Sequence, residues 1–103
     1  MEQKNIGCYM RYNSSENLGS KIKEMCDYAQ SHNRTVEKIV TERRSGIEPL
    51  SDEFYNLIEN PNIDIIIVPS ISCITRNYLI ISEVEQKVRA LKKSVISLDG
   101  SYI

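Results

Sequence analysis

The segment from Ile63 to Val68 constrains the fold of this chain more than any other. It ends in four β-branched residues, Ile65-Ile66-Ile67-Val68, with no polar residue among them. A strand with one wet face alternates apolar and polar residues, whereas a strand covered on both faces is apolar throughout, as in parallel sheets. We therefore expect a central strand of a parallel sheet here. Even with Pro69 the apolar run stays far below the roughly 20 residues that a membrane-spanning helix needs.

Strand and helix patterns alternate along the rest of the chain. Apolar and β-branched residues predict strands over 5–12, 35–41, 63–68 and 94–98. Apolar residues at helical spacing predict helices over 18–30, 51–59 and 78–93, the last with Leu91 on its buried side. The order β-α-β-α-β-α-β predicts an α/β fold of three layers. Its centre is a mainly parallel four-stranded sheet in the order 2-1-3-4, with helices on both faces.

Composition narrows the class of protein. The chain has 103 residues, of which 41% are hydrophobic and 26% charged, and its net charge is −1. This length fits one domain, so residues 1–103 are predicted to form a single unit. The charge balance excludes a generally basic surface for nucleic acid but leaves room for a local basic patch. Because the N-terminal residues hold no signal-peptide pattern, we expect a cytoplasmic domain without a membrane partner.

The cysteines and the histidine do not form a metal-binding pattern. Cys8, Cys26 and Cys73 stand far apart, and His32 is the only histidine. A structural zinc site needs about four Cys or His ligands in close spacing, so we expect no metal and no cofactor. Cys8 and Cys26 are interpreted as small buried apolar residues, and His32 as a surface residue near a helix end.

Three predicted loops collect arginines and hydroxyl groups at the carboxyl ends of the strands, where open α/β sheets place their sites. The residues concerned are Arg11, Asn13, Ser14 and Ser15 in the first loop, Glu42, Arg43, Arg44, Ser45 and Gly46 in the second, and Ser70, Ser72, Cys73, Thr75 and Arg76 in the third. Guanidinium groups, hydroxyls and a helix N-terminus suit a phosphate ligand. The alternative is that Arg11 pairs with Glu42 while Arg43 and Arg44 are solvated loop charges.

Several of these segments resemble the serine recombinases of the resolvase and invertase group. The run Tyr9-Met10-Arg11-Tyr12-Asn13-Ser14 resembles that family's opening Tyr-x-Arg-Val-Ser-Ser. Ser45-Gly46 is similar to its Ser-Gly loop, and residues 65–77 are similar to its third strand with the Leu-Asp-Arg-Leu-Ser-Arg-Asn segment. The resemblance covers residues 6–98 and implies a resolvase-like catalytic domain.

The resemblance implies a chemistry that this chain only partly retains. Family members attack a DNA phosphate with a serine hydroxyl, form a phosphoserine link and stabilise the transition state with arginines, without metal. Arg11 and Arg76 match two of those arginines, and Arg44 and Ser45 would join them at the phosphate. The nucleophile position is occupied by Asn13, whose amide cannot replace a hydroxyl. Two further arginines and an acid of the family pattern are also absent.

We therefore expect a recombinase-like domain for DNA strand exchange that has lost strand cleavage. It would contact DNA weakly or through a partner subunit, and it would associate with copies of itself or with other recombinase subunits. It is expected to lack the family's long dimer helix and DNA-binding domain. Two alternatives stay open: a non-enzymatic interaction or phosphate-binding module with the same fold, and an active recombinase in which Ser14 attacks. Cys73 is a remaining candidate for an activated thiol beside Arg76.

Overall fold

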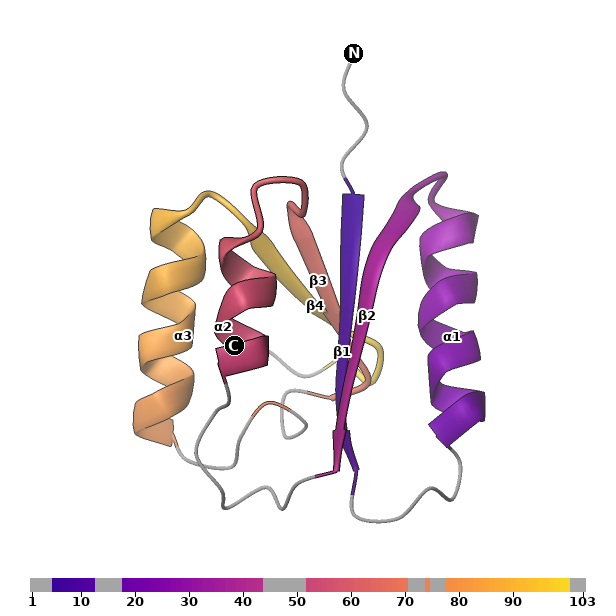
Figure 1. Ribbon diagram of the computed structural model, residues 1–103, viewed down its shortest axis with the longest axis horizontal. Coiled ribbons are helices and arrows are strands. Elements are labelled where there is room, and N and C mark those ends of the chain that lie inside the picture. Colours follow the sequence, from indigo (N-terminus) through magenta and orange to yellow (C-terminus); the bar gives the residue numbers. More distant parts are fainter. Residues whose placement is uncertain (1–4, 13–17, 44–51, 71–73, 75–77, 101–103) are drawn as a thin grey trace.

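The computed structural model describes residues 5–12, 18–43, 52–70, 74 and 78–100, and shows seven alternating strands and helices (Figure 1). In chain order they are β1 (Asn5–Tyr12), α1 (Leu18–Ser31), β2 (Thr35–Arg43), α2 (Asp52–Glu59), β3 (Ile65–Val68), α3 (Tyr78–Ala90) and β4 (Ser94–Ser97). None of these helices is both long and apolar enough to cross a membrane, a finding that covers the described part of the chain.

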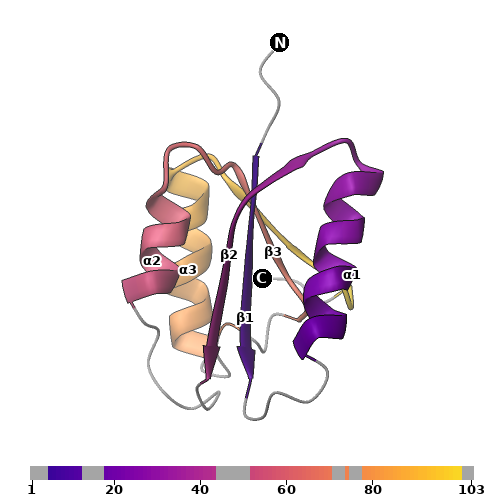
Figure 2. The same cartoon turned by 45° about the vertical axis from the view of Figure 1, so that its right-hand side comes forward.

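The four strands form one sheet in the order β2-β1-β3-β4, and every neighbouring pair is parallel. Helix α1 covers one face of the sheet, and α2 and α3 cover the other (Figures 1 and 2). The predicted three-layer α/β fold, its strand order and its helices on both faces are thus confirmed.

Strand β1 divides its side chains between two apolar clusters because successive side chains of a strand point to opposite faces. Ile6, Cys8 and Met10 belong to the cluster under α1. Tyr9 belongs to the cluster under α2 and α3. The pattern carries over to β3, where Ile67 packs in the first cluster and Ile66 and Val68 in the second. The expected burial of β3 on both faces is therefore confirmed.

Gly7 of β1 lies against the side chains of Leu57 in α2 and of Ile63. A Cβ atom at this position would stand 2.8 Å from Cδ1 of Leu57 and 2.9 Å from Cδ1 of Ile63. Real carbon contacts are not this short, so a side chain on Gly7 would force the side chains of Leu57 and Ile63 to move. The absence of a side chain at residue 7 thus leaves room for Leu57 and Ile63 in the core.

Three predicted boundaries were wrong by two or more residues. Strand β3 begins at Ile65 instead of Ile63. Strand β2 continues to Arg43, because Thr41, Glu42 and Arg43 pair with the last residues of β1 through their backbones. Helix α3 ends at Ala90 instead of continuing to Lys93, and Lys92 adopts a positive φ of 60° that breaks the helical path. Leu91, expected on the buried side of that helix, lies beyond its end and is 40% exposed.

Lys93 forms hydrogen bonds with the C-terminal end of α2. Its Nζ donates hydrogen bonds to the carbonyl oxygen of Ile58 and, at 2.6 Å, to that of Asn60. The last carbonyl groups of a helix have no partner within the helix, so this lysine satisfies acceptors at the end of α2. Burial of the ammonium group lowers the pKa of Lys93, and the charges of Asp64 and Glu59 oppose that shift.

Replacing Gly7 tests the close approach of α2. We expect Gly7→Ala to lower the free energy of unfolding by about 1–3 kcal/mol, the usual cost of an overpacked core. The control is Gly19→Ala in α1, where an added Cβ meets nothing within 4 Å. This control should be neutral or stabilising by up to about 1 kcal/mol, because alanine favours a helix. Urea denaturation measures both, and equal stabilities would contradict the packing described.

Replacing Lys93 tests how much its hydrogen bonds at the end of α2 stabilise the fold. We expect Lys93→Met, which keeps the stem and removes the donors, to cost about 1–3 kcal/mol because partly buried carbonyl groups lose their partners. Its exposed neighbour provides the control, since Lys92→Met should stay within about 0.5 kcal/mol of the wild type. Thermal denaturation compares the two variants. A Lys93→Met variant as stable as its control would show that the bonds contribute nothing.

Candidate functional site

The carboxyl ends of β1, β2 and β3 lie at one edge of the sheet, the lower edge in Figure 1. From β1 the chain crosses to β2 through α1 on one face, and from β3 it crosses to β4 through α3 on the opposite face. The switch point therefore lies between the adjacent strands β1 and β3. Ligand sites of open α/β folds form at such a point.

Arg11 lies near this end of β1 and is buried. It is 6% exposed, and among the described residues it is the one buried charged side chain. A buried charge is costly unless it is paired and hydrogen-bonded. The surroundings of the guanidinium group must therefore supply a hydrogen-bond acceptor and a counter-charge, and Tyr9 and Glu42 do so.

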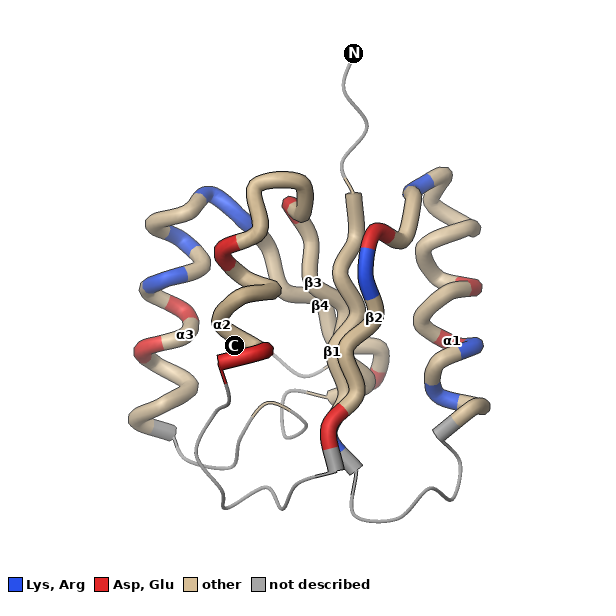
Figure 3. The backbone as a smooth tube through the Cα atoms, in the orientation of Figure 1, with Lys and Arg blue, Asp and Glu red and all other residues tan. Residues whose placement is uncertain are grey.

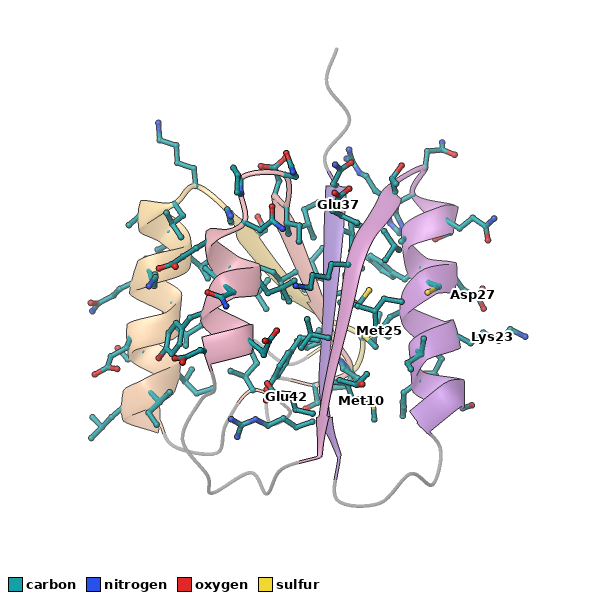
Figure 4. The ribbon with its side chains drawn as sticks, in the orientation of Figure 1. Met10, Lys23, Met25, Asp27, Glu37 and Glu42 are labelled. Atoms are coloured by element: carbon teal, nitrogen blue, oxygen red, sulfur yellow. The ribbon has the colours of Figure 1, made fainter. Side chains whose placement is uncertain are left out.

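Tyr9 connects Arg11 to Glu42. Nε of Arg11 donates a hydrogen bond of 2.9 Å to the Tyr9 hydroxyl, and that hydroxyl donates one of 3.0 Å to Oε1 of Glu42. Arg11 and Glu42 are also register partners in β1 and β2. Glu42 lies on the α2 side of the sheet and Met10 on the α1 side (Figure 4). We call Tyr9, Arg11 and Glu42 the bridged triad.

The ring of Tyr9 is fixed by packing. It is 0% exposed and meets Phe54 of α2 edge to face, with 4.7 Å between ring centroids. Such aromatic pairs are favoured by the opposite charge of ring edge and ring face. The hydroxyl thus starts from a rigid ring, and its position between the two charged groups is set by the core.

The Tyr9 hydroxyl is unsuited to act as a nucleophile. Burial raises its pKa to about 12, while the hydrogen bond and charge of Arg11 lower it and Glu42 raises it further. A nucleophile needs an accessible atom and a depressed pKa or an adjacent base that can remove its proton. With the ring fully buried and the pKa raised, the hydroxyl orients its neighbours instead.

Of the residues predicted to hold the phosphate, Arg11 is the one that the structure describes; of the other predicted loop residues it describes Glu42, Ser70 and the backbone of Arg43. Asn13, Ser14, Arg44, Ser45 and Arg76 lie outside the described residues, as do Ser15, Gly46, Ser72, Cys73 and Thr75. The expected convergence of Arg11 and Arg76 therefore stays a prediction. The hydroxyl of Tyr9 links Arg11 to Glu42, the two residues of the alternative pairing.

Sequence reasoning missed the bridging role of Tyr9. It offers Glu42 as a partner of Arg11 but places Glu42 in a loop instead of in β2. One signal was available, because residues 9 and 11 share a face of any strand. The position of Glu42 opposite Arg11 depends on how far β2 extends, which the polar side chains of residues 41–43 concealed.

Cys8 and His32 lie as the sequence predicted, and Cys26 does not. Within the described ranges no group of three His, Cys, Asp or Glu side chains could hold a metal. Cys8 is buried, and burial together with nearby Cys26 raises its pKa to about 12. Cys26 is only partly buried, contrary to expectation, because it lies at the side of the α1 stripe. His32 is exposed and stacks on Tyr28 at 4.3 Å.

Comparison with known proteins identifies the fold. No family model and no curated protein matches the chain. The catalytic domain of ISC1926 TnpA, an IS607-like serine recombinase, superposes with a TM-score of 0.82 at 17% identity, over 96% of this chain and 70% of that chain. The catalytic domain of TP901-1 integrase gives 0.82 at 23% identity, over 95% and 79%. A serine recombinase from Sulfolobus solfataricus gives 0.68 at 14%, over 98% and 72%.

The chain therefore has the fold of serine recombinase catalytic domains, as its sequence resemblance predicted. At these identities the likeness establishes the architecture, so what the chain does must be argued from its own residues.

Alkaline titration tests the burial of the Tyr9 hydroxyl. A pKa raised to about 12 in the folded chain, against roughly 10 in the unfolded chain, means that the folded state disfavours tyrosinate. The resulting stability is fully present below pH 10 and is lost as the pH rises toward 12. We expect absorbance at 295 nm to show a late ionisation that Tyr9→Phe removes and that urea shifts to ordinary pH. If Tyr9→Phe instead removes an ionisation at the pH of an ordinary tyrosine, the Tyr9 hydroxyl is not buried as described.

Proposed function

We propose, from a fold shared with serine recombinase catalytic domains, that this chain contacts the phosphate backbone of DNA through Arg11 and does not cleave it. The observation that carries the proposal is the placement of Arg11, held by Tyr9 and Glu42 at the carboxyl end of β1 beside the switch point. In the family that the sequence resembles, an arginine at this place neutralises the phosphate.

The geometry of the guanidinium group supports phosphate as the ligand. An arginine has five N–H donors, and Tyr9 engages the one on Nε. The remaining four are on the two terminal nitrogens, whose fork matches a pair of phosphate oxygens. Because Arg11 is only 6% exposed, a phosphate reaches it only when the groups that cover it move. Binding through Arg11 is therefore weak.

Helix α1 adds positive potential at the same edge. It begins at Leu18, carries no acid in its first turn and has Lys21 and Lys23 in its first half (Figure 3). Lys21 pairs with Glu24 at 3.5 Å, while Lys23 points away from the sheet (Figure 4). The N-terminal end of a helix attracts anions. A DNA backbone at Arg11 would thus also meet a favourable helix end.

Cleavage is excluded in this proposal by the side chain at the nucleophile position. Asn13 stands two residues after Arg11, where the family has serine. An amide has no accessible anion that could attack phosphorus, and loss of a nucleophile alone removes most catalysis. Ser14 is one residue away, and on an extended backbone that reverses the direction of a side chain. A domain of this kind would act in complexes with other recombinase subunits that carry the serine.

Binding to DNA tests the role of Arg11. We expect a fluorescent 20-base-pair duplex at low salt to bind weakly, and Arg11→Gln to reduce the slope of log affinity against log salt by about 1, the value for one lost phosphate contact. The control is Arg89→Gln on α3, which removes an exposed arginine that pairs with Glu85. Arg11→Lys, which keeps the charge, should retain part of the binding. Equal slopes for Arg11→Gln and its control would refute the site.

Covalent trapping tests the absence of cleavage. Supercoiled plasmids carrying the DNA that flanks the gene are incubated with the chain and quenched with detergent. We expect no protein attached to a 5′ end, since no serine hydroxyl occupies residue 13. A covalent adduct that disappears in Ser14→Ala would overturn the proposal in favour of an active recombinase. An adduct that persists in Ser14→Ala and disappears in another variant would overturn it as well.

A further inference from the structure

The bridged triad places a cation and an anion on the same hydroxyl oxygen. Because the two hydrogen bonds of the Tyr9 hydroxyl measure 2.9 and 3.0 Å, Nε of Arg11 and Oε1 of Glu42 lie within about 6 Å of each other, a range in which opposite charges interact strongly. A phosphate that binds Arg11 would therefore enter the field of a carboxylate. Within the triad, one residue orients Arg11 and the other lowers its affinity for phosphate.

We infer that Tyr9 and Glu42 set the affinity of Arg11 for a DNA phosphate: the Tyr9 hydroxyl positions the guanidinium group, and the Glu42 carboxylate competes with the phosphate for its charge. This inference rests on the proposed function. Neither residue touches the reacting groups in this account, so both are positioning residues. They act in opposite directions on the same ligand.

The positioning role follows from the fixed ring of Tyr9. Packing against Phe54 and complete burial hold the ring, so its hydroxyl accepts from Nε at a defined point. With Nε held there, the planar guanidinium group keeps its terminal nitrogens in one orientation. Without the hydroxyl, Nε–H loses this acceptor in a buried setting, and the Glu42 carboxylate loses the O–H donor that Tyr9 supplies. Both consequences reduce the affinity for phosphate.

The competing role follows from the position of Glu42. It is partly buried on the edge strand β2, directly opposite Arg11 in the register. A carboxylate near a phosphate raises the energy of the bound state by repulsion, and it lowers the energy of the free state by attracting the arginine. Glutamine has the same shape, and its amide oxygen still accepts from the Tyr9 hydroxyl. Glu42→Gln thus removes the competing charge and keeps the bridge.

Paired variants separate this device from a purely structural role. We expect Tyr9→Phe to weaken binding of the 20-base-pair duplex about tenfold, the effect of one charge-assisted hydrogen bond, and Glu42→Gln to strengthen it about tenfold by removing a nearby like charge. The controls are Tyr55→Phe on α2, whose ring lies under Lys87 at 5.0 Å, and Glu37→Gln, an exposed acid on β2. Each control should stay within about twofold of the wild type.

The Nε–H signal of Arg11 in nitrogen-15 NMR spectra reports the bridge without DNA. It should exchange slowly with solvent in the wild type and in Glu42→Gln, and rapidly in Tyr9→Phe. This readout tests the positioning of Arg11 even in a variant whose stability has fallen, provided that the spectrum remains that of a folded chain.

Opposite effects of the two variants support the inference. Weaker binding in both would show that the triad only holds the fold together and would overturn it. So would a Tyr9→Phe variant that binds like the wild type, or one that keeps a slowly exchanging Nε–H. A wild-type chain that does not bind the duplex refutes the proposed function itself, and this outcome is distinct from binding that ignores Tyr9 and Glu42.

Discussion

A permanent charge inside the protein organises the carboxyl edge of this sheet. Arginine stays protonated at any physiological pH, so Arg11 can be buried only where hydrogen bonds and a counter-charge compensate for lost water. The structure supplies both through one hydroxyl group, that of Tyr9, which links Arg11 to Glu42. The arrangement requires β1 beside β2 in the observed register, Tyr9 on the same face as Arg11, and Phe54 of α2 against the tyrosine ring. The burial of Arg11 at this edge thus depends on the pairing of β1 with β2 and on the packing of α2.

The interior of the sheet was predictable because a strand buried on both faces has only apolar residues, and the sequence shows such a run directly. The run from Ile65 to Val68 has no polar residue and became β3, whose last three residues are buried. The alternation of helices and strands then left few ways to connect parallel strands. These features depend on local patterns, which a single sequence displays directly.

Features that join distant residues were not predictable in the same way. Glu42 and Tyr9 are separated by 33 positions, and Lys93 reaches the carbonyl of Ile58 across 35. Residues 41–43 are polar and pair through their backbones, and backbone pairing leaves no periodic signal. The sequence located Arg11 as a site residue from its motif and offered Glu42 as its partner, but the hydroxyl of Tyr9 that links the two became evident only when the register of β1 and β2 was known.

A crystal structure of the chain with a short DNA duplex tests the central claim most directly. The account predicts a backbone phosphate within hydrogen-bond distance of the terminal nitrogens of Arg11, with Nε still bonded to the hydroxyl of Tyr9 and the DNA strand intact. DNA seated elsewhere, with Arg11 turned away from every phosphate, would contradict the account.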